Sequence, residues 1–357
     1  CALPIYITRT LKQYGYNPTV DPMIFSKRVA NDFIMLSLHV DDFYVISSSQ
    51  KMLNKLYDQL TTNYKEITKK TGDILNYLGI TITKNDNNTI TITQPTLVEK
   101  IINTANLSNC KGISTPISIN QTYNDKFDNI SVDKTYYLRL VGLINYLASY
   151  TRPDLLYSLS RIAQSCSNPT ESDMIRVKRI IRHISETKEY GITYDDNLDW
   201  FIYCHVDASY NCYVDGKGHY GYTICIGRNN GSICAKSSKM KIVALSSTEA
   251  EYVALCHAVS QIIFFRELLK QLGFSNSKPS VVFEDNLSCI KMIYGQLNHQ
   301  TTKHINVRYH FTKDQVHENN VEILHCRTEE QIADVLTKPL PVEQHYYLSS
   351  RLLNLSV

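Results

Sequence analysis

The stretch Leu245-Ser-Ser-Thr-Glu-Ala-Glu-Tyr-Val-Ala-Leu255 predicts the start of a long helix, and the elements around it indicate the fold class. Ser246 and Glu249 have the spacing of a capping box, in which two side chains satisfy the free amides at a helix N-terminus. Apolar residues then recur at steps of three and four, which is typical of a helix with one buried face: Tyr252, Leu255, Val259, Ile262, Phe265, Leu269 and Leu272.

Strands are predicted on both sides of this helix. Before it, apolar runs indicate strands at 200–207, 220–227 and 232–239, with a turn at Asn229-Asn-Gly231. After it we expect a strand at 280–283, a helix at 286–294, a strand at 321–325 and a final helix opened by a second capping box, Thr328-Glu-Glu-Gln331. Three antiparallel strands followed by alternating helices and strands indicate an α/β layer with a mixed five-stranded sheet.

The chain before residue 200 has a different pattern. Runs at 33–40 and 43–46 predict a hairpin with a tight corner at Asp41-Asp42, and 77–83 with 89–93 predicts a second hairpin. Helical spacing occupies 51–66 and most of 136–188, while the polar stretch 120–133 is the expected linker. Taken with the α/β layer, the whole chain is predicted to be an α+β protein.

Composition sets only broad limits on function. The 357 residues are 43% hydrophobic and 20% charged, with a net charge of +3, which is ordinary for a globular protein. The ten cysteines form no C-x-x-C pair, so a reduced intracellular compartment fits better than a disulfide framework. No apolar run approaches the roughly 20 residues of a membrane helix, so no membrane partner is expected. Because the first residue is Cys1, the sequence is expected to be part of a longer one.

Four acids stand where such a fold brings chain segments together. Asp207 ends the first strand of the α/β layer, Glu251 lies in the first turns of the long helix, Asp285 follows the fourth strand, and Asp334 lies in the last predicted helix. Converging carboxylates ionise together only if a cation neutralises them, and Mg²⁺ prefers oxygen ligands. Two such ions could activate water and stabilise the leaving oxygen of a phosphodiester. The alternative for any one of them is a helix cap or a solvated acid.

The C-terminal stretches resemble the ribonuclease H of copia-type long-terminal-repeat retrotransposons. The stretches that carry the resemblance are Val206-Asp-Ala-Ser209, Leu245–Tyr252, Glu284-Asp-Asn286, Thr302–Phe311 and Ala333-Asp-Val-Leu-Thr-Lys-Pro-Leu340. The resemblance implies an Asp–Glu–Asp–Asp site at Asp207, Glu251, Asp285 and Asp334 that holds two Mg²⁺ ions, with Mn²⁺ as a substitute. Between Glu249 and Glu251, we expect Glu251 to be the ligand, because Ala250-Glu-Tyr-Val-Ala-Leu255 matches the family pattern and Glu249 caps the helix.

The first half of the chain resembles the reverse transcriptase of the same elements. His39-Val-Asp-Asp42 is similar to the family's Tyr-Val-Asp-Asp box, which implies catalytic roles for Asp41 and Asp42, and Tyr77–Ile80 with Thr91–Gln94 is similar to the primer-gripping hairpin. Further matches are Tyr137–Gly142, Tyr146-Leu-Ala148, Thr151-Arg-Pro-Asp154, Asn168-Pro169 and Lys178-Arg179. Two departures matter: His39 replaces the aromatic Tyr, and the third palm carboxylate is expected upstream of this sequence. Polymerase activity is therefore expected only in a full-length polyprotein.

The resemblance also divides the chain into parts. It implies partial palm and thumb over 1–119, a connection over 120–195, ribonuclease H over 196–340 and a C-terminal tail over 341–357.

Several further residues are candidates for auxiliary and binding roles. His325 precedes Asp334 by nine residues and matches a mobile His that assists related enzymes; a solvated strand-end His is the alternative. Lys178, Arg179 and Arg182 lie on a basic helix predicted at 171–187 that would follow a hybrid's phosphates, against a merely solvated helix face. Lys303 and Arg308 are further candidates for phosphate contacts.

The predicted activity is metal-dependent endonucleolytic cleavage of RNA in RNA–DNA hybrids. The rival is an inactive transposon relic that at most binds nucleic acid. Expected partners are the hybrid, an RNA template, a DNA primer, and either upstream Pol segments or an oligomeric partner. The resemblance implies a cytoplasmic location in virus-like particles and leaves the nucleus open.

Overall fold

The computed structural model describes residues 3–64, 66–119, 130–196, 199–274, 277–295 and 306–355. The chain forms two compact units. Unit 1 contains Cys1–Tyr77 and Ile263–Ser277, and unit 2 contains Leu78–Ile262 and Lys278–Val357. These bounds differ from the four parts inferred from the sequence, so that division stays a prediction.

Unit 1 is built on an antiparallel sheet in the order β1-β2-β3-β4. Its elements are α1 (Leu3–Gln13), β1 (Asn17–Pro18), β2 (Ile24–Val29), β3 (Asp32–His39), β4 (Asp42–Ser47), α2 (Gln50–Asn63) and β5 (Ile74–Tyr77). Ile34, Leu36 and Leu38 alternate along β3 and are buried, as expected for a strand with one face on a core. The β3–β4 hairpin was predicted, but its corner is Val40–Asp41, with Val40 at φ 57°, an unusual conformation for a β-branched residue.

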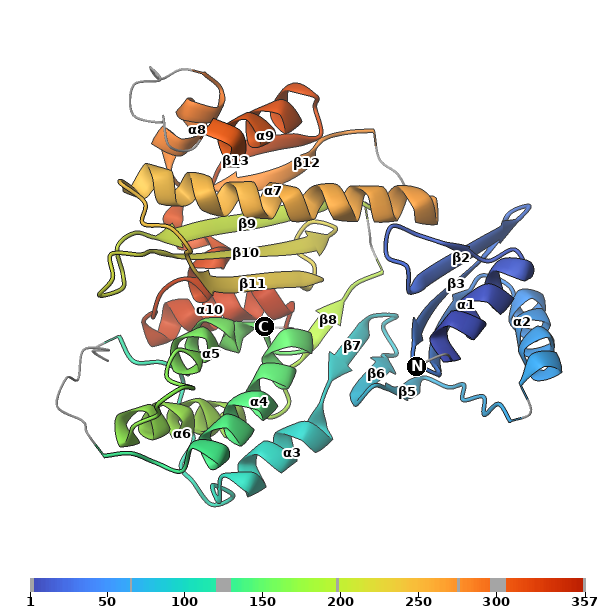
Figure 1. Ribbon diagram of the computed structural model, residues 1–357, viewed down its shortest axis with the longest axis horizontal. Coiled ribbons are helices and arrows are strands. Elements are labelled where there is room, and N and C mark those ends of the chain that lie inside the picture. The colour runs from blue at the N-terminus through green and yellow to red at the C-terminus, as the bar shows by residue number, and fades with distance from the viewer. Residues whose placement is uncertain are drawn as a thin grey trace. The chain divides into compact units, whose positions relative to one another are not determined.

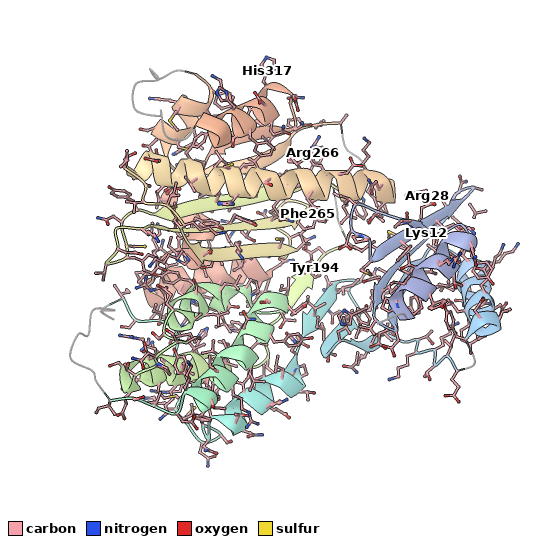
Figure 2. All side chains as sticks on the ribbon, in the orientation of Figure 1. Lys12, Arg28, Tyr194, Phe265, Arg266 and His317 are labelled. Atoms are coloured by element: carbon pink, nitrogen blue, oxygen red, sulfur yellow. The ribbon has the colours of Figure 1, made fainter. Side chains whose placement is uncertain are left out.

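The first part of unit 2 is a helical cluster with a small sheet. Its elements are β6 (Ile80–Lys84), β7 (Ile90–Thr93), α3 (Pro95–Thr104), α4 (Lys134–Tyr150), η1 (Pro153–Leu155), α5 (Leu156–Ala163), α6 (Glu171–Glu186) and β8 (Ile192–Tyr194). The predicted strand 77–83 is interrupted, because Leu78 and Gly79 have φ 51° and 72° and turn the chain before β6. Tyr194 of β8 (Figure 2) donates its hydroxyl hydrogen to Ser232 O at 3.0 Å, which ties β8 to the β10–β11 turn described next.

The second part of unit 2 contains the predicted mixed five-stranded sheet, in the order β11-β10-β9-β12-β13 (Figure 1). Its elements are β9 (Ile202–Ser209), β10 (His219–Ile226), β11 (Cys234–Lys239), α7 (Ser247–Leu272), β12 (Ser280–Glu284), α8 (Leu287–Ile293), α9 (Asn306–His317), β13 (Val321–His325), η3 (Thr328–Glu330), η4 (Ile332–Leu336) and α10 (Val342–Leu353). Strands β9, β10 and β11 are antiparallel, and β12 runs parallel to both β9 and β13. The predicted α+β class is confirmed.

The C-terminal end differs from its prediction. Thr328-Glu-Glu-Gln331 does not open an α-helix. Thr328–Glu330 itself and Ile332–Leu336 form two short 3₁₀ segments, and the Gln331 side chain accepts a hydrogen bond from the Ala333 amide. Pro339 and Pro341 prevent one helix from running through, because proline has no amide hydrogen. The range 341–357, predicted as a C-terminal tail, contains α10, whose Leu348 and Leu352 pack on η4.

Helix α7 is long and apolar enough, by length and composition alone, to cross a membrane. However, 44% of the apolar 18-residue window within α7 is buried inside the protein. Tyr252, Leu255 and Val259 are fully buried, and the His257 ring stacks on Tyr220 of β10 at 4.7 Å between centroids. The part of α7 up to Ile262 is therefore a core helix of unit 2.

Candidate metal centre

Three of the four predicted acids meet at one edge of the five-stranded sheet. Asp207 of β9, Glu251 of α7 and Asp285 after β12 each offer a carboxylate oxygen, and these oxygens lie within 4.8 Å of one another. The parallel register pairs Phe283 with His205, so two residues further along each strand Asp285 comes beside Asp207. Asp207 and Glu251 are buried, and Asp285 is half-buried and accepts a hydrogen bond from Thr328 Oγ1 at 2.9 Å.

The structure separates the roles of the two neighbouring glutamates. Glu249 completes a helix cap: its amide donates to Ser246 Oγ at 3.1 Å, and its Oε2 accepts from the Leu245 amide at 2.7 Å. Glu251 Oε2 is buried and has no hydrogen-bond partner among the residues that the structure describes. Glu251 therefore has a free oxygen toward the cluster, whereas Glu249 is occupied by the cap.

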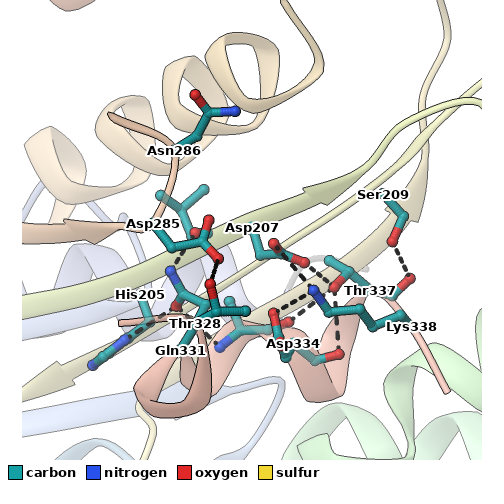
Figure 3. A network of polar contacts seen from close by, with 12 residues as sticks. His205, Asp207, Ser209, Asp285, Asn286, Thr328, Gln331, Asp334, Thr337 and Lys338 are labelled. Carbon is teal, nitrogen blue, oxygen red and sulfur yellow. Dashed lines mark hydrogen bonds and ion pairs between the residues drawn. The ribbon is translucent and has the colours of Figure 1, made fainter. Parts of the chain in front are cut away.

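Asp334 is linked to this group of acids by Lys338, whose ammonium lies near both Asp334 and Asp207. The Lys338 ammonium lies 2.8 Å from Asp334 Oδ1 and 3.8 Å from Asp207 Oδ1 (Figure 3). Thr337, fully buried, donates its hydroxyl hydrogen to Asp207 Oδ2. The Leu336-Thr-Lys338 segment at the end of η4 thus orients Asp207 and supplies one positive charge between two acids.

Gly221 makes room for that segment. It stands opposite Asp207 in the antiparallel β9–β10 register. A Cβ atom at Gly221 would lie 2.6 Å from Leu336 Cβ and 3.0 Å from Thr337 Cγ2. Since real Cβ atoms do not approach so closely, a glycine is required for Thr337 to reach Asp207.

The cluster contains a further buried acid that the sequence reasoning missed. Glu284 is fully buried. Its Oε1 accepts from the Asn286 amide at 2.9 Å, and its Oε2 has no hydrogen-bond partner in the described part of the chain. In β12 it shares the buried side with Val282 and Ser280, two and four residues earlier. That period-two alternation was the available signal, because it places a glutamate in the core beside Asp285.

The site is strongly acidic and poorly solvated. Burial, with the neighbouring carboxylates, raises the pKa of Asp207 and of Asp334, the latter to about 7. The same causes raise the pKa of Glu251 and Glu284 well above the usual range. Such raised pKa values mean that the ionised carboxylates repel one another, and a divalent cation would relieve this repulsion. Within the described residues, Glu251 Oε2 has no hydrogen-bond partner, and together with Asp207 and Asp285 it fits a hard, oxygen-seeking ion such as Mg²⁺.

The predicted polymerase acids lie elsewhere. Asp41 and Asp42 are exposed at the β3–β4 corner of unit 1. Over the described ranges, three or more potential metal ligands come together only at Asp207, Glu251 and Asp285. The Asp41-Asp42 corner therefore has no third ligand among these residues.

The predicted basic helix is only partly free for phosphate. In α6, Arg179 donates to Thr115 Oγ1 at 3.0 Å, and Arg182 donates to the Lys111 carbonyl at 2.7 Å. Lys178 is exposed. The two arginines thus fasten the 111–115 segment, and a contact of this helix with nucleic acid stays a prediction.

Two further groups of candidates have different standing. His325, at the end of β13, is exposed and lies on the wall of a cavity. Its auxiliary role in the nuclease stays a prediction. Lys303 lies outside the described residues, and of Arg308 only its place in α9 is described.

Comparisons with known proteins agree with the sequence motifs. Residues 3–119 match the family described as reverse transcriptase (RNA-dependent DNA polymerase). Over 330 residues, 90% of the chain, the sequence is 29% identical to the retrovirus-related Pol polyprotein of transposon TNT 1-94 from Nicotiana tabacum. It is 28% identical over 91% of the chain to the corresponding polyprotein of transposon RE1 from Arabidopsis thaliana. The predicted resemblance to copia-type Pol polyproteins is confirmed.

The extent of these matches is uneven. The chain covers 24% and 22% of the two polyproteins, so it spans about a quarter of the length of the curated relatives it matches. Among solved structures, ribonuclease H1 LC11, crystallised in complex with an RNA/DNA hybrid, aligns with 38% of this chain and 93% of its own. That alignment has 17% identity and a TM-score of 0.31.

Proposed function

We propose that this chain, a relative of copia-type retrotransposon Pol polyproteins, carries a metal-dependent nuclease centre in unit 2 that cleaves the RNA strand of RNA–DNA hybrids. The observation that carries the proposal is the convergence of the Asp207, Glu251 and Asp285 carboxylates within 4.8 Å. These acids come from the motifs on which the resemblance to ribonuclease H rests. A scaffold role would not require several buried carboxylates to face one another at a free energy cost.

Each residue of the centre has a separate task in this proposal. Asp207, Glu251 and Asp285 would hold the metal, with Asp334 as the fourth acid beside them. Two Mg²⁺ ions bound there would activate the attacking water and stabilise the leaving oxygen. Thr337 fixes the Asp207 carboxylate through its hydroxyl, and Lys338 holds Asp334 by an ion pair. Such prior orientation lowers the reorganisation needed at the moment of reaction.

The support for DNA polymerase activity comes from unit 1 and is less complete. The match of residues 3–119 to the reverse transcriptase family, together with Asp41 and Asp42, supports a role in DNA synthesis within a longer polyprotein. A two-metal polymerase site needs a third carboxylate, and the described part of unit 1 brings none to this corner. The rival reading, an inactive relic that only binds nucleic acid, is disfavoured because all four predicted acids are present.

Hybrid cleavage is the direct test. Purified chain should shorten the labelled RNA strand of an RNA–DNA hybrid in Mg²⁺, leave single-stranded RNA and duplex DNA uncut, and stop when EDTA removes the metal. Asp207→Asn should abolish cleavage, and Asp215→Asn is the matched control because Asp215 forms an exposed pair with Lys239 at 2.9 Å. Cleavage that survives in Asp207→Asn, or none with the unaltered folded chain, would contradict the proposal.

A further inference from the structure

Unit 2 contains a cavity of about 760 Å³ that is distinct from the acidic centre. Residues of β9, β10, the 325–332 segment and α10 line it, and none of Asp207, Glu251, Asp285 or Asp334 is among them. Its volume lies within the range of about 300–1,000 Å³ found for small-molecule sites. The acids of the proposed nuclease do not line this space; His325, the candidate auxiliary residue, lies on its outer wall.

The buried wall of the cavity carries a histidine whose hydrogen-bonding state is fixed by its neighbours. Gln331 Nε2 donates to the carbonyls of Val206 at 2.9 Å and Phe283 at 3.3 Å, so Gln331 Oε1 is the acceptor facing His205 Nδ1 at 3.1 Å (Figure 3). His205 Nδ1 must then carry the hydrogen, and Nε2 keeps a free lone pair. His205 is 8% exposed, lines the cavity, and its Nε2 has no hydrogen-bond partner within the described part of the chain.

Stacking also fixes the orientation of the His205 imidazole. Its ring stacks on Phe283 at 4.7 Å between centroids. Ser350, also on the wall and 3% exposed, has a hydroxyl with no hydrogen-bond partner among the described residues. The inner wall therefore offers one acceptor and one hydroxyl that a bound molecule could satisfy.

The rim of the cavity is positively charged. Three arginines line it, Arg228, Arg327 and Arg351, against one acid, Glu330. Glu330 pairs with Arg351. Arg228 and Arg327 are exposed and form no ion pair with any residue that the structure describes. Two guanidinium groups are thus available for an anion, and guanidinium matches phosphate in shape and charge.

We propose that this cavity binds a nucleotide, with its phosphate on Arg228 and Arg327 and a sugar hydroxyl or base amino group donating to His205 Nε2. Inorganic phosphate alone would bind the two arginines of the rim. His205 Nε2 would then have no donor from the ligand, and water would fill most of the cavity. An uncharged nucleoside would satisfy His205 but not the arginines. The proposal does not rest on the nuclease centre, whose residues lie outside the cavity wall.

Calorimetric titration of the whole chain with adenosine 5′-monophosphate tests the proposal, with inorganic phosphate and adenosine as separate arms. We expect the monophosphate to bind roughly tenfold more tightly than either part, since it makes both sets of contacts. His205→Phe keeps the stacking ring but removes the acceptor, and should weaken binding of the monophosphate by roughly tenfold without changing binding of inorganic phosphate. Arg327→Gln, at an exposed position, should weaken the binding of both adenosine monophosphate and inorganic phosphate. His317→Phe, at the exposed end of α9, is the control and should change neither.

Two results would overturn the proposal. One is no binding of adenosine monophosphate at millimolar concentration by the folded chain. The other is equal binding of the monophosphate by the unaltered chain, His205→Phe and Arg327→Gln. Hybrid cleavage by the same preparations is a separate readout, so failure of the nuclease proposal and failure of this one are distinguishable.

Discussion

Glu249 and Glu251 stand two residues apart on one helix but have opposite surroundings. Glu249 serves the helix cap, whereas Glu251 faces other carboxylates with an unpartnered oxygen. Binding of Mg²⁺ should raise the melting temperature of the unaltered chain. Glu251→Gln should abolish both this rise and hybrid cleavage. The metal-free variant should be at least as stable as the unaltered chain, because a charge repelled by its neighbours is removed. Glu249→Gln should cost at most about 1 kcal/mol of unfolding free energy and preserve both metal effects. The reverse pattern in melting curves and cleavage assays would move the metal ligand to Glu249.

Thr337 is the residue on which the orientation of Asp207 depends. Thr337→Val keeps the shape but leaves a buried carboxylate oxygen without its donor, so unfolding free energy should fall by about 1–3 kcal/mol. Partners of metal ligands typically affect metal affinity about 10–100-fold, and a loss of that size is expected in an Mg²⁺ titration followed by melting temperature. Thr337→Ser restores the hydroxyl and should recover most of the affinity. Equal affinity in Thr337→Val and the unaltered chain would show that the hydroxyl does not matter.

Among the elements, β10 is constrained by a single glycine. Gly221→Ala would push its new Cβ into Leu336 and Thr337, so η4 must shift away from Asp207. Overpacking of this kind costs about 1–3 kcal/mol, and Mg²⁺ binding should weaken as well. Gly142→Ala in α4 is the matched control, because an added Cβ there meets nothing within 4 Å and alanine favours a helix. Urea unfolding of both variants, with and without Mg²⁺, measures the free energy of unfolding and its increase on metal binding. Equal values for the two variants would refute a special role for Gly221.

The elements of unit 2 show what local sequence can and cannot predict. The Ser246–Glu249 capping box predicted the start of α7, because both side chains are free to cap. The same pattern at Thr328–Gln331 failed: Thr328 binds Asp285 instead, and the Gln331 side chain bonds to the Val206 and Phe283 carbonyls. Tertiary partners of this kind are invisible in a linear pattern.

The acidic centre was predictable in part for the same reason. Strand ends and a known motif order brought out Asp207, Glu251 and Asp285. Glu284 was missed because Glu284 and the adjacent Asp285 were treated as a single motif, although the alternation along β12 places Glu284 on the buried side. Arg179 and Arg182 were predicted to contact phosphates, with a solvated helix face as the alternative. Their partners at Thr115 and Lys111 come from a segment about 70 residues away that no local pattern predicts.

On the scale of the whole molecule, α7 belongs to both compact units, since its residues from Ile263 onward are grouped with unit 1. Within unit 1, Arg28 Nη2 donates to the Leu272 carbonyl at 2.7 Å, and its guanidinium lies 5.6 Å from the Phe33 ring and 5.7 Å from the Phe274 ring. The last carbonyls of a helix lack partners within the helix, and a cation there also interacts favourably with the helix dipole. Arg28 is therefore expected to stabilise the C-terminal end of α7 specifically.

Arg28→Ala should let that end open more often without loosening the part that carries Glu251. Amide hydrogen exchange at 266–272 should speed up by roughly three- to thirtyfold, corresponding to about 0.5–2 kcal/mol, since local opening is governed by local contacts. Exchange at 252–262 should stay as slow as in the unaltered chain, because its side chains there are buried in unit 2. Arg9→Ala, at an exposed position of α1, is the control and should change neither segment. If both segments of α7 exchange faster in Arg28→Ala, the helix opens as one cooperative element, and the centre around Glu251 depends on unit 1 for its order.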